Sequence, residues 1–193
     1  MTPETGVYEY ARQGLVKSEN NTALWFCGRS LSFRELFARI DQTAERLYAM
    51  GVRQGTVITV HLPSCPQAVV VFYAVAKLGA ICNMVHAQTP VHGVRELMRF
   101  AASKILFTHL PTCIGISEET VLVDVLPVSE TANNALWPTL VLGEEFKAHL
   151  CENAEIPEQS RLAQTGVVYL HSSGSTGRPK TIVLSHSALN HCV

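Results

Sequence analysis

The sequence lacks the features that mark several classes of protein. Its 193 residues carry a formal net charge of −1, so no strong field of one sign suggests a nucleic-acid or membrane-surface partner. No apolar run reaches the roughly 20 residues that a transmembrane helix needs. The N-terminus has neither the basic nor the apolar region of a secretory signal. With 47% hydrophobic residues, the chain is expected to be a soluble, cytoplasmic globular protein.

Aspartate is scarce, and the placement of the cysteines and aspartates excludes further classes. The six cysteines form no C-x-x-C pair and stand mostly in apolar segments, which fits buried free thiols better than a disulfide framework. Asp41 and Asp124 are the only aspartates and neither lies in a motif, so no Ser-His-Asp arrangement is predicted. No Cys/His spacing matches a metal site, and no metal-ligating residue is predicted.

The histidines have a structural and a functional interpretation. His61, His86 and His109 fall at the ends of three predicted strands, where open parallel sheets often place ligand-binding residues. Partly buried structural histidines are the simpler interpretation, and His86 is the best candidate for the functional one. His186 and His191 are five residues apart, which does not put both on one helix face for chelation.

Strand and helix patterns alternate through the first half of the chain. The helix after Ser32 has complete signals: Glu35 forms a capping box with Ser32, Leu31 and Leu36 occupy hydrophobic-staple positions, and Gly51 ends it. Strands are expected at residues 23–27, 29–31, 56–61, 80–85 and 104–109.

A second helix is expected to begin after Ser64, with Pro66 in its first turn and Gln67 as the capping-box partner. Its apolar body, residues 68–78, could instead be a buried strand, but the caps and the length favour a helix. A third helix starts at Thr89-Pro90. The β-α-β-α-β order predicts a parallel sheet with right-handed crossovers.

The chain divides into four expected parts: a polar lead-in at 1–22, an α/β portion at 23–110, an irregular connection at 111–165 and a final segment at 166–193. One helical turn is expected near residues 8–13. The connection holds candidate strands at 120–125 and 139–142, a surface loop at 126–138 and a short helix at 144–150. In the last segment, strands at 166–170 and 181–184 flank a loop, and Ser185 caps a helix from His186.

That loop is the strongest candidate for chemistry. Residues 169–180 read Tyr-Leu-His-Ser-Ser-Gly-Ser-Thr-Gly-Arg-Pro-Lys. Glycines let the backbone approach a ligand, consecutive N–H groups can converge on an anion, and hydroxyls and a lysine add donors and charge. The candidate phosphate-binding residues are Ser172, Ser173, Gly174, Ser175, Thr176, Gly177 and Lys180. The pattern is not a P-loop, because Pro179 stands where the second glycine is required. A Ser/Gly surface linker is the alternative, which the short length, apolar flanks and closing Pro-Lys pair disfavour.

The same twelve residues resemble the AMP-binding signature of the adenylate-forming superfamily, with every position matched. This superfamily includes acyl-CoA synthetases, luciferases and the adenylation domains of peptide synthetases. Residues 183–186 resemble the end of the strand that follows the signature in the family. Residues 31–36, 51–55 and 76–80 resemble blocks that precede it in the same order. The resemblance covers about residues 20–110 and 165–191.

The resemblance implies a fold and a reaction. The fold would be the N-terminal portion of a large α/β domain, with a parallel sheet flanked by helices. A carboxylic acid would attack the α-phosphate of ATP, giving an acyl-adenylate and pyrophosphate, and a thiol such as coenzyme A would then take the acyl group. The loop would hold the β- and γ-phosphates while Mg²⁺ neutralises charge. Lys180 and Thr176 would be catalytic, and His186 would lie near the acyl pocket.

Two positions depart from the commonest family pattern: His171 replaces an aromatic residue, and Thr181 replaces the glycine after Lys180. These departures leave the acceptor open between coenzyme A and a carrier-protein thiol, as in peptide-synthetase-like or carboxylate-reductase proteins. The adenine, ribose and catalytic-lysine motifs of the family would lie beyond Val193, in a C-terminal part of the same enzyme. The chain is therefore expected to be incomplete and inactive alone. The alternative of another class is a truncated, non-catalytic nucleotide-binding fragment.

Overall fold

The computed structural model describes residues 5–14, 18–113, 115–117, 119–123, 156–157, 162–172 and 180–192. The candidate elements at 126–138, 139–142 and 144–150 lie outside these residues. Among the described helices, none is long and apolar enough to cross a membrane.

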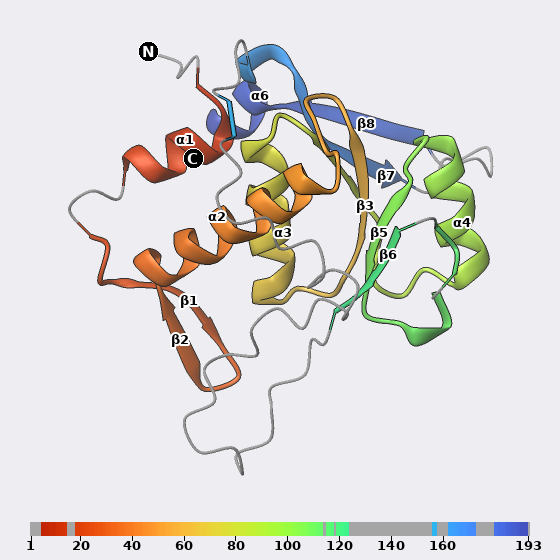
Figure 1. The fold of residues 1–193 in the computed structure, drawn as a ribbon, viewed down its shortest axis with the longest axis horizontal. Helices are drawn as coiled ribbons and strands as arrows, with labels where there is room; N and C mark the ends of the chain where they lie inside the picture. Colours follow the sequence, from red (N-terminus) through yellow and green to blue (C-terminus); the bar gives the residue numbers. More distant parts are fainter. Residues whose placement is uncertain are drawn as a thin grey trace.

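The elements follow the predicted alternation (Figure 1). The strands are β1 Thr22–Phe26, β2 Arg29–Ser32, β3 Val57–His61, β4 Ile81–Met84, β5 Ile105–Thr108, β6 Glu119–Leu122, β7 Gly166–Ser172 and β8 Lys180–Ser185. The helices are α1 Val7–Gln13, α2 Phe33–Ala49, α3 Pro66–Lys77, α4 Val91–Phe100 and α6 His186–Asn190, with 3-10 turns at Pro111–Cys113 and Leu162–Gln164.

The main sheet has six strands in the order β6-β5-β3-β4-β7-β8. The first five of these strands run parallel, which confirms the predicted parallel sheet, while β8 runs antiparallel to β7. The hairpin follows from the short connection, because a parallel crossover needs a dozen or more residues and only 173–179 are available. The separate β1–β2 hairpin stands apart from this sheet.

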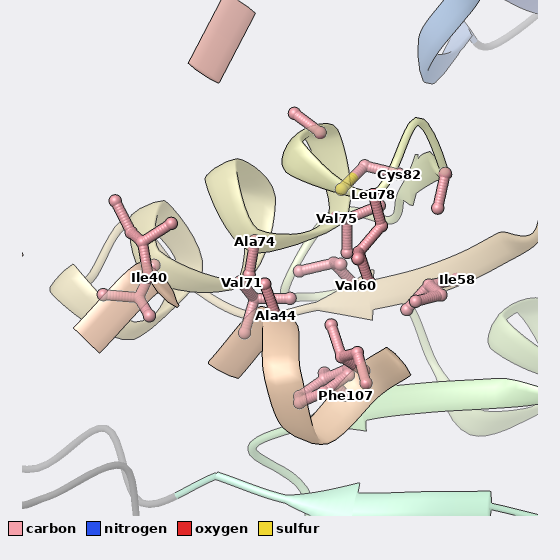
Figure 2. Packing of buried hydrophobic residues seen from close by; sticks show 14 of the residues in the cluster. Ile40, Ala44, Ile58, Val60, Val71, Ala74, Val75, Leu78, Cys82 and Phe107 are labelled. Carbon is pink, nitrogen blue, oxygen red and sulfur yellow. The ribbon is translucent and has the colours of Figure 1, made fainter. Parts of the chain in front are cut away.

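The core lies between the sheet and the helix pair α2–α3 (Figure 2). Ile40 and Ala44 on α2 and Val71 and Val75 on α3 are fully or almost fully buried, and they pack with the inward residues of β3, β4 and β5. Alternate strand residues face the opposite side, where Leu106 packs with Val94 and Met98 of α4. Helices therefore cover both faces of the parallel part of the sheet.

The start of α2 confirms the predicted capping box. The Ser32 hydroxyl accepts from the backbone N–H of Glu35 at 3.3 Å, and the Glu35 carboxylate accepts from the backbone N–H of Ser32 at 2.8 Å. Gly51 ends the helix at φ 90°, a left-handed conformation that favours glycine.

The predicted cap of α3 is wrong. The N-cap is Cys65 rather than Ser64, no side chain caps the helix, and Gln67 forms no capping box. Pro66 at the first helical position explains the difference, because proline forces the preceding residue into an extended conformation. Cys65 has that conformation, with φ −141° and ψ 161°.

A charged cluster holds α1 against the helix pair. Asp41 of α2 accepts from the Tyr8 hydroxyl at 2.5 Å, from Arg12 at 2.7 Å and from Lys77 at 2.8 Å. These partners lower the pKa of the Asp41 carboxyl despite its partial burial. The first helix is thereby tied to both α2 and α3.

Candidate functional site

The β7–β8 hairpin brings together the two ends of the predicted phosphate loop. Ser172 ends β7 and Lys180 begins β8, and the two residues are cross-strand partners. Both are exposed. Ser172 also ends a parallel strand, so the loop starts at the carboxyl edge of the sheet, where open α/β sheets bind ligands.

The remaining loop residues, Ser173, Gly174, Ser175, Thr176 and Gly177, lie outside the described residues. Their assignment to phosphate, and that of Thr176 to catalysis, stays a prediction. The structure supplies the positions of the two loop ends and the surroundings of the strands that carry them.

A line of hydrogen-bonded polar side chains runs across the sheet beside the loop. Thr181 Oγ1 lies 3.1 Å from His171 Nδ1, and His171 Nε2 lies 2.5 Å from Asn83 Oδ1 on β4. Asn83 Nδ2 donates to Thr59 Oγ1 on β3 at 3.0 Å. Asn83 and Thr59 are fully buried. The two positions that depart from the family pattern, His171 and Thr181, are therefore bonded to each other.

Sequence reasoning missed Asn83 and Thr59. The available signal was a polar residue inside each of two apolar strands, at the centre of Ile81–Met84 and of Val57–His61. A polar side chain buried in a central strand needs a hydrogen-bond partner. Both residues find that partner in the same line.

His186 lies in a buried position at the start of α6, whose N-cap Ser185 accepts from the N–H of Ala188 as predicted. Its Nδ1 accepts from the backbone N–H of Val7 at 3.0 Å, and Asn190 donates to the carbonyl of Thr5. Burial lowers the pKa of His186 to about 4. Its described contacts join the two ends of the chain, and its place near an acyl pocket stays a prediction.

The histidines at the strand ends have structural partners. His61 is fully buried, with Nδ1 3.0 Å from Thr108 Oγ1 and Nε2 3.1 Å from the carbonyl of Ala87. His109 Nδ1 contacts the carbonyl of His61 at 3.1 Å, and His86 Nδ1 accepts from the N–H of Gln88. In the described part of the chain, no three metal-binding side chains are grouped.

The described cysteines are free thiols. Cys65, Cys82 and Cys113 are buried, while Cys27 and Cys192 are exposed. Burial raises the pKa of Cys65 and of Cys82, which keeps both as neutral thiols. These two thiols are poor nucleophiles, and they fill space in the core.

An apolar groove of about 640 Å³ lies on the α3 side of the sheet. It is bordered by β1, the segment after β3, the first turns of α3 and Met84 of β4. Met84 is the partner of Leu170, which precedes Ser172 by two positions on the same face. The groove thus opens on the sheet face that also carries Ser172 and Lys180.

The fold matches known proteins. The N-terminal subdomain of NpsA from Klebsiella oxytoca, solved in complex with 3-hydroxyanthranilyl-AMSN, superposes with a TM-score of 0.71 at 19% identity. The match covers 94% of this chain and 41% of that one. This likeness places the chain in the α/β class seen in that subdomain.

Curated relatives extend the likeness to sequence. Acetyl-coenzyme A synthetase 2 of Eremothecium gossypii is 28% identical over 171 residues, which cover 80% of this chain and 25% of the relative. FR901469 synthetase of Dothideomycetidae sp. is 24% identical over 183 residues, covering 95% of this chain and 1% of that protein. The chain spans about a quarter of the acetyl-coenzyme A synthetase.

The sequence profile of the AMP-binding enzyme family matches residues 11–193. The chain belongs to this family of adenylate-forming enzymes, and its match covers the N-terminal portion of the related acyl-CoA synthetases.

Proposed function

We propose that this chain supplies the pyrophosphate side of an ATP site in an enzyme that activates a carboxylic acid as an acyl-adenylate. The observation that carries the proposal is the hairpin geometry, which sets Ser172 opposite Lys180 at the carboxyl edge of the sheet. Hydroxyl and ammonium donors at one loop mouth suit a leaving pyrophosphate, whose charge must be stabilised as the α-phosphate is attacked.

In this proposal the loop residues 173–177 supply backbone N–H groups and hydroxyls to the β- and γ-phosphates, and Lys180 supplies a positive charge. Mg²⁺ would neutralise phosphate charge when bound. No side chain of this chain needs to form a covalent intermediate.

The second half-reaction would transfer the acyl group to a thiol. Coenzyme A is the acceptor that the likeness to acetyl-coenzyme A synthetases supports. The departures at His171 and Thr181 from the family pattern support a second candidate, an adenylation module that hands its acyl group to a carrier protein. A catalytically inactive nucleotide-binding fragment is the candidate of another class.

Exchange of labelled pyrophosphate into ATP tests the first half-reaction directly. The full translation product of the gene that encodes this chain is assayed with a panel of carboxylic acids. We expect exchange that depends on one class of acid. Coenzyme A and a carrier protein are then offered as acceptors to distinguish the two catalytic candidates. Binding of ATP without exchange for any acid would favour the inactive fragment and contradict the proposal.

A further inference from the structure

The polar line beside the loop connects its two strands to the interior of the sheet. His171 and Thr181 are cross-strand partners, one position inside the partners Ser172 and Lys180. Their side chains bond on the face opposite Ser172 and Lys180, because successive strand residues alternate between faces. Ser172 and Lys180 thus lie on the face of the predicted ligand, and His171 and Thr181 join the two strands on the opposite face.

The fully buried end of the line is fixed in place. Asn83 and Thr59 are cross-strand partners at the centre of the parallel sheet, and neither is accessible to solvent. The bond from His171 to Asn83 reaches from this rigid part to the hairpin, spanning 88 positions of sequence. Through it, β7 and β8 are held to β4 at their loop ends.

The hydrogen-bond pattern assigns the tautomer of His171. Asn83 uses its Nδ2 donor for Thr59, so its Oδ1 acceptor faces His171 Nε2, and that nitrogen must carry the hydrogen. Burial lowers the pKa of His171, so the ring is neutral at neutral pH and its Nδ1 is bare. Thr181 then donates its hydroxyl hydrogen to Nδ1. Each of the three hydrogen bonds between Thr181 and Thr59 thus joins one donor to one matching acceptor.

We propose that His171, as the Nε2–H tautomer, is a positioning residue of the phosphate loop. Its Nδ1 accepts a hydrogen bond from the Thr181 hydroxyl, and its Nε2–H donates one to the buried Asn83. These two bonds fix the positions of Lys180 and Ser172 before the phosphates bind. The proposal rests on the proposed function of the loop and adds the residues that set its geometry. A loop whose ends are already held loses less conformational freedom on binding, which strengthens the interaction.

Calorimetric titration of the 193-residue chain with magnesium pyrophosphate tests the proposal. Thr181→Val removes the hydroxyl at nearly constant shape, and we expect the Kd for pyrophosphate to rise about tenfold, the equivalent of one hydrogen bond. Thr181→Ser keeps the hydroxyl and should restore binding to within about twofold of the unsubstituted chain. His171→Phe keeps a planar ring but ends both bonds, so it should weaken pyrophosphate binding at least as much as Thr181→Val.

Thr108→Val is the matched control. It removes a threonine hydroxyl from another histidine, His61, on the same sheet but away from the loop. We expect it to leave the Kd within about twofold of the unsubstituted chain, even if it lowers the thermal stability. Equal weakening by Thr108→Val and Thr181→Val, or no weakening by Thr181→Val, would overturn the positioning role.

Nitrogen NMR of the chain with labelled histidines measures the tautomer of His171, which a purely structural role would not determine. The His171 signals, identified by their loss in His171→Phe, should show a protonated Nε2 and a bare Nδ1. A protonated Nδ1 would overturn the assignment.

Failure of the proposed function gives a different pattern. If the unsubstituted chain does not bind pyrophosphate, or Lys180→Ala binds it equally well, the phosphate role of the loop is wrong. Amide hydrogen exchange at Ser172 and Lys180 then decides the positioning role separately. Faster amide exchange in Thr181→Val than in Thr181→Ser would support the proposal that this hydrogen bond fixes the loop ends. Equal exchange in the two variants would overturn that proposal.

Discussion

At the scale of single residues, His186 links the pH of the solution to the stability of the fold. Its ring is fully buried, Nδ1 accepts from the N–H of Val7, and Nε2 meets no partner among the described residues. Burial lowers its pKa from 6.5 to about 4 in the folded chain. Between these values the unfolded chain binds a proton that the folded chain does not, so the stability rises with pH.

We expect this residue to contribute a slope of at most about 1.4 kcal/mol per pH unit to the free energy of unfolding between pH 4 and 6.5. The pKa values of His61 and His171 are lowered in the same direction, so a variant must isolate the effect. His186→Gln should reduce the slope measured by urea unfolding at a series of pH values. An unchanged slope would show that His186 is accessible to protons in the folded state.

Asn83 shows what residue-level reading of a sequence cannot supply. Its polar character inside an apolar strand indicates a buried hydrogen bond, but not the partner. That partner, His171, lies 88 positions away and was noted only for its departure from the family pattern. The hydrogen bond between Asn83 and His171 depends on which strands are neighbours, and only the sheet order β3-β4-β7 shows that.

At the scale of the elements, the start of α2 offers a direct test of a local signal. Ser32→Ala removes the hydroxyl that accepts from the Glu35 N–H. We expect it to lower the free energy of unfolding by about 1 kcal/mol, the usual value of an N-cap. Chemical denaturation provides the measurement.

Ser30→Ala is the matched control, because Ser30 is an exposed residue of the same hairpin strand and lies outside the helix. Its effect should remain within about 0.5 kcal/mol. Equal losses in the two variants would mean that the capping box contributes nothing to stability.

Local signals predicted most element boundaries because they act over a few residues. The strands, α2, α4 and α6 were expected close to where they occur, and the apolar run after residue 68 is helical as favoured. The cap of α3 was assigned wrongly to Ser64, although Pro66 already excluded a helical conformation for Cys65. The antiparallel direction of β8 was not predicted, although the shortness of the connection at 173–179 contained that information.

At the scale of the whole molecule, the chain spans only part of the length of the relatives that it matches. The acetyl-coenzyme A synthetase relative is matched over only 25% of its length. We therefore expect the purified 193-residue chain alone to show no acid-dependent exchange of pyrophosphate into ATP. The family resemblance implies that the adenine, ribose and catalytic-lysine contacts come from parts of the relatives that this chain does not match. Detectable exchange by this chain would contradict that division of the active site.

The fold class could be predicted from sequence at this scale, and so could the two strands that flank the candidate loop. A twelve-residue pattern between two apolar strands indicates the loop, and the strand–helix alternation indicates the sheet. The apolar groove on the α3 side could not be predicted, because it is formed by β1, the segment after β3, α3 and β4 and follows no local pattern. The roles of Ser173, Gly174, Ser175, Thr176 and Gly177 stay predictions.

Lys180→Ala in the full translation product, with the two half-reactions measured separately, tests the central claim most directly. Lys104→Ala removes the same charge at the opposite, amino edge of the sheet, next to the start of β5, and serves as the control. We predict that Lys180→Ala slows acyl-adenylate formation about a hundredfold, as expected for the loss of a group that stabilises developing charge. Transfer from preformed acyl-adenylate to the thiol should remain unchanged. Slowing of the thiol transfer alone would contradict the assignment of this loop to pyrophosphate.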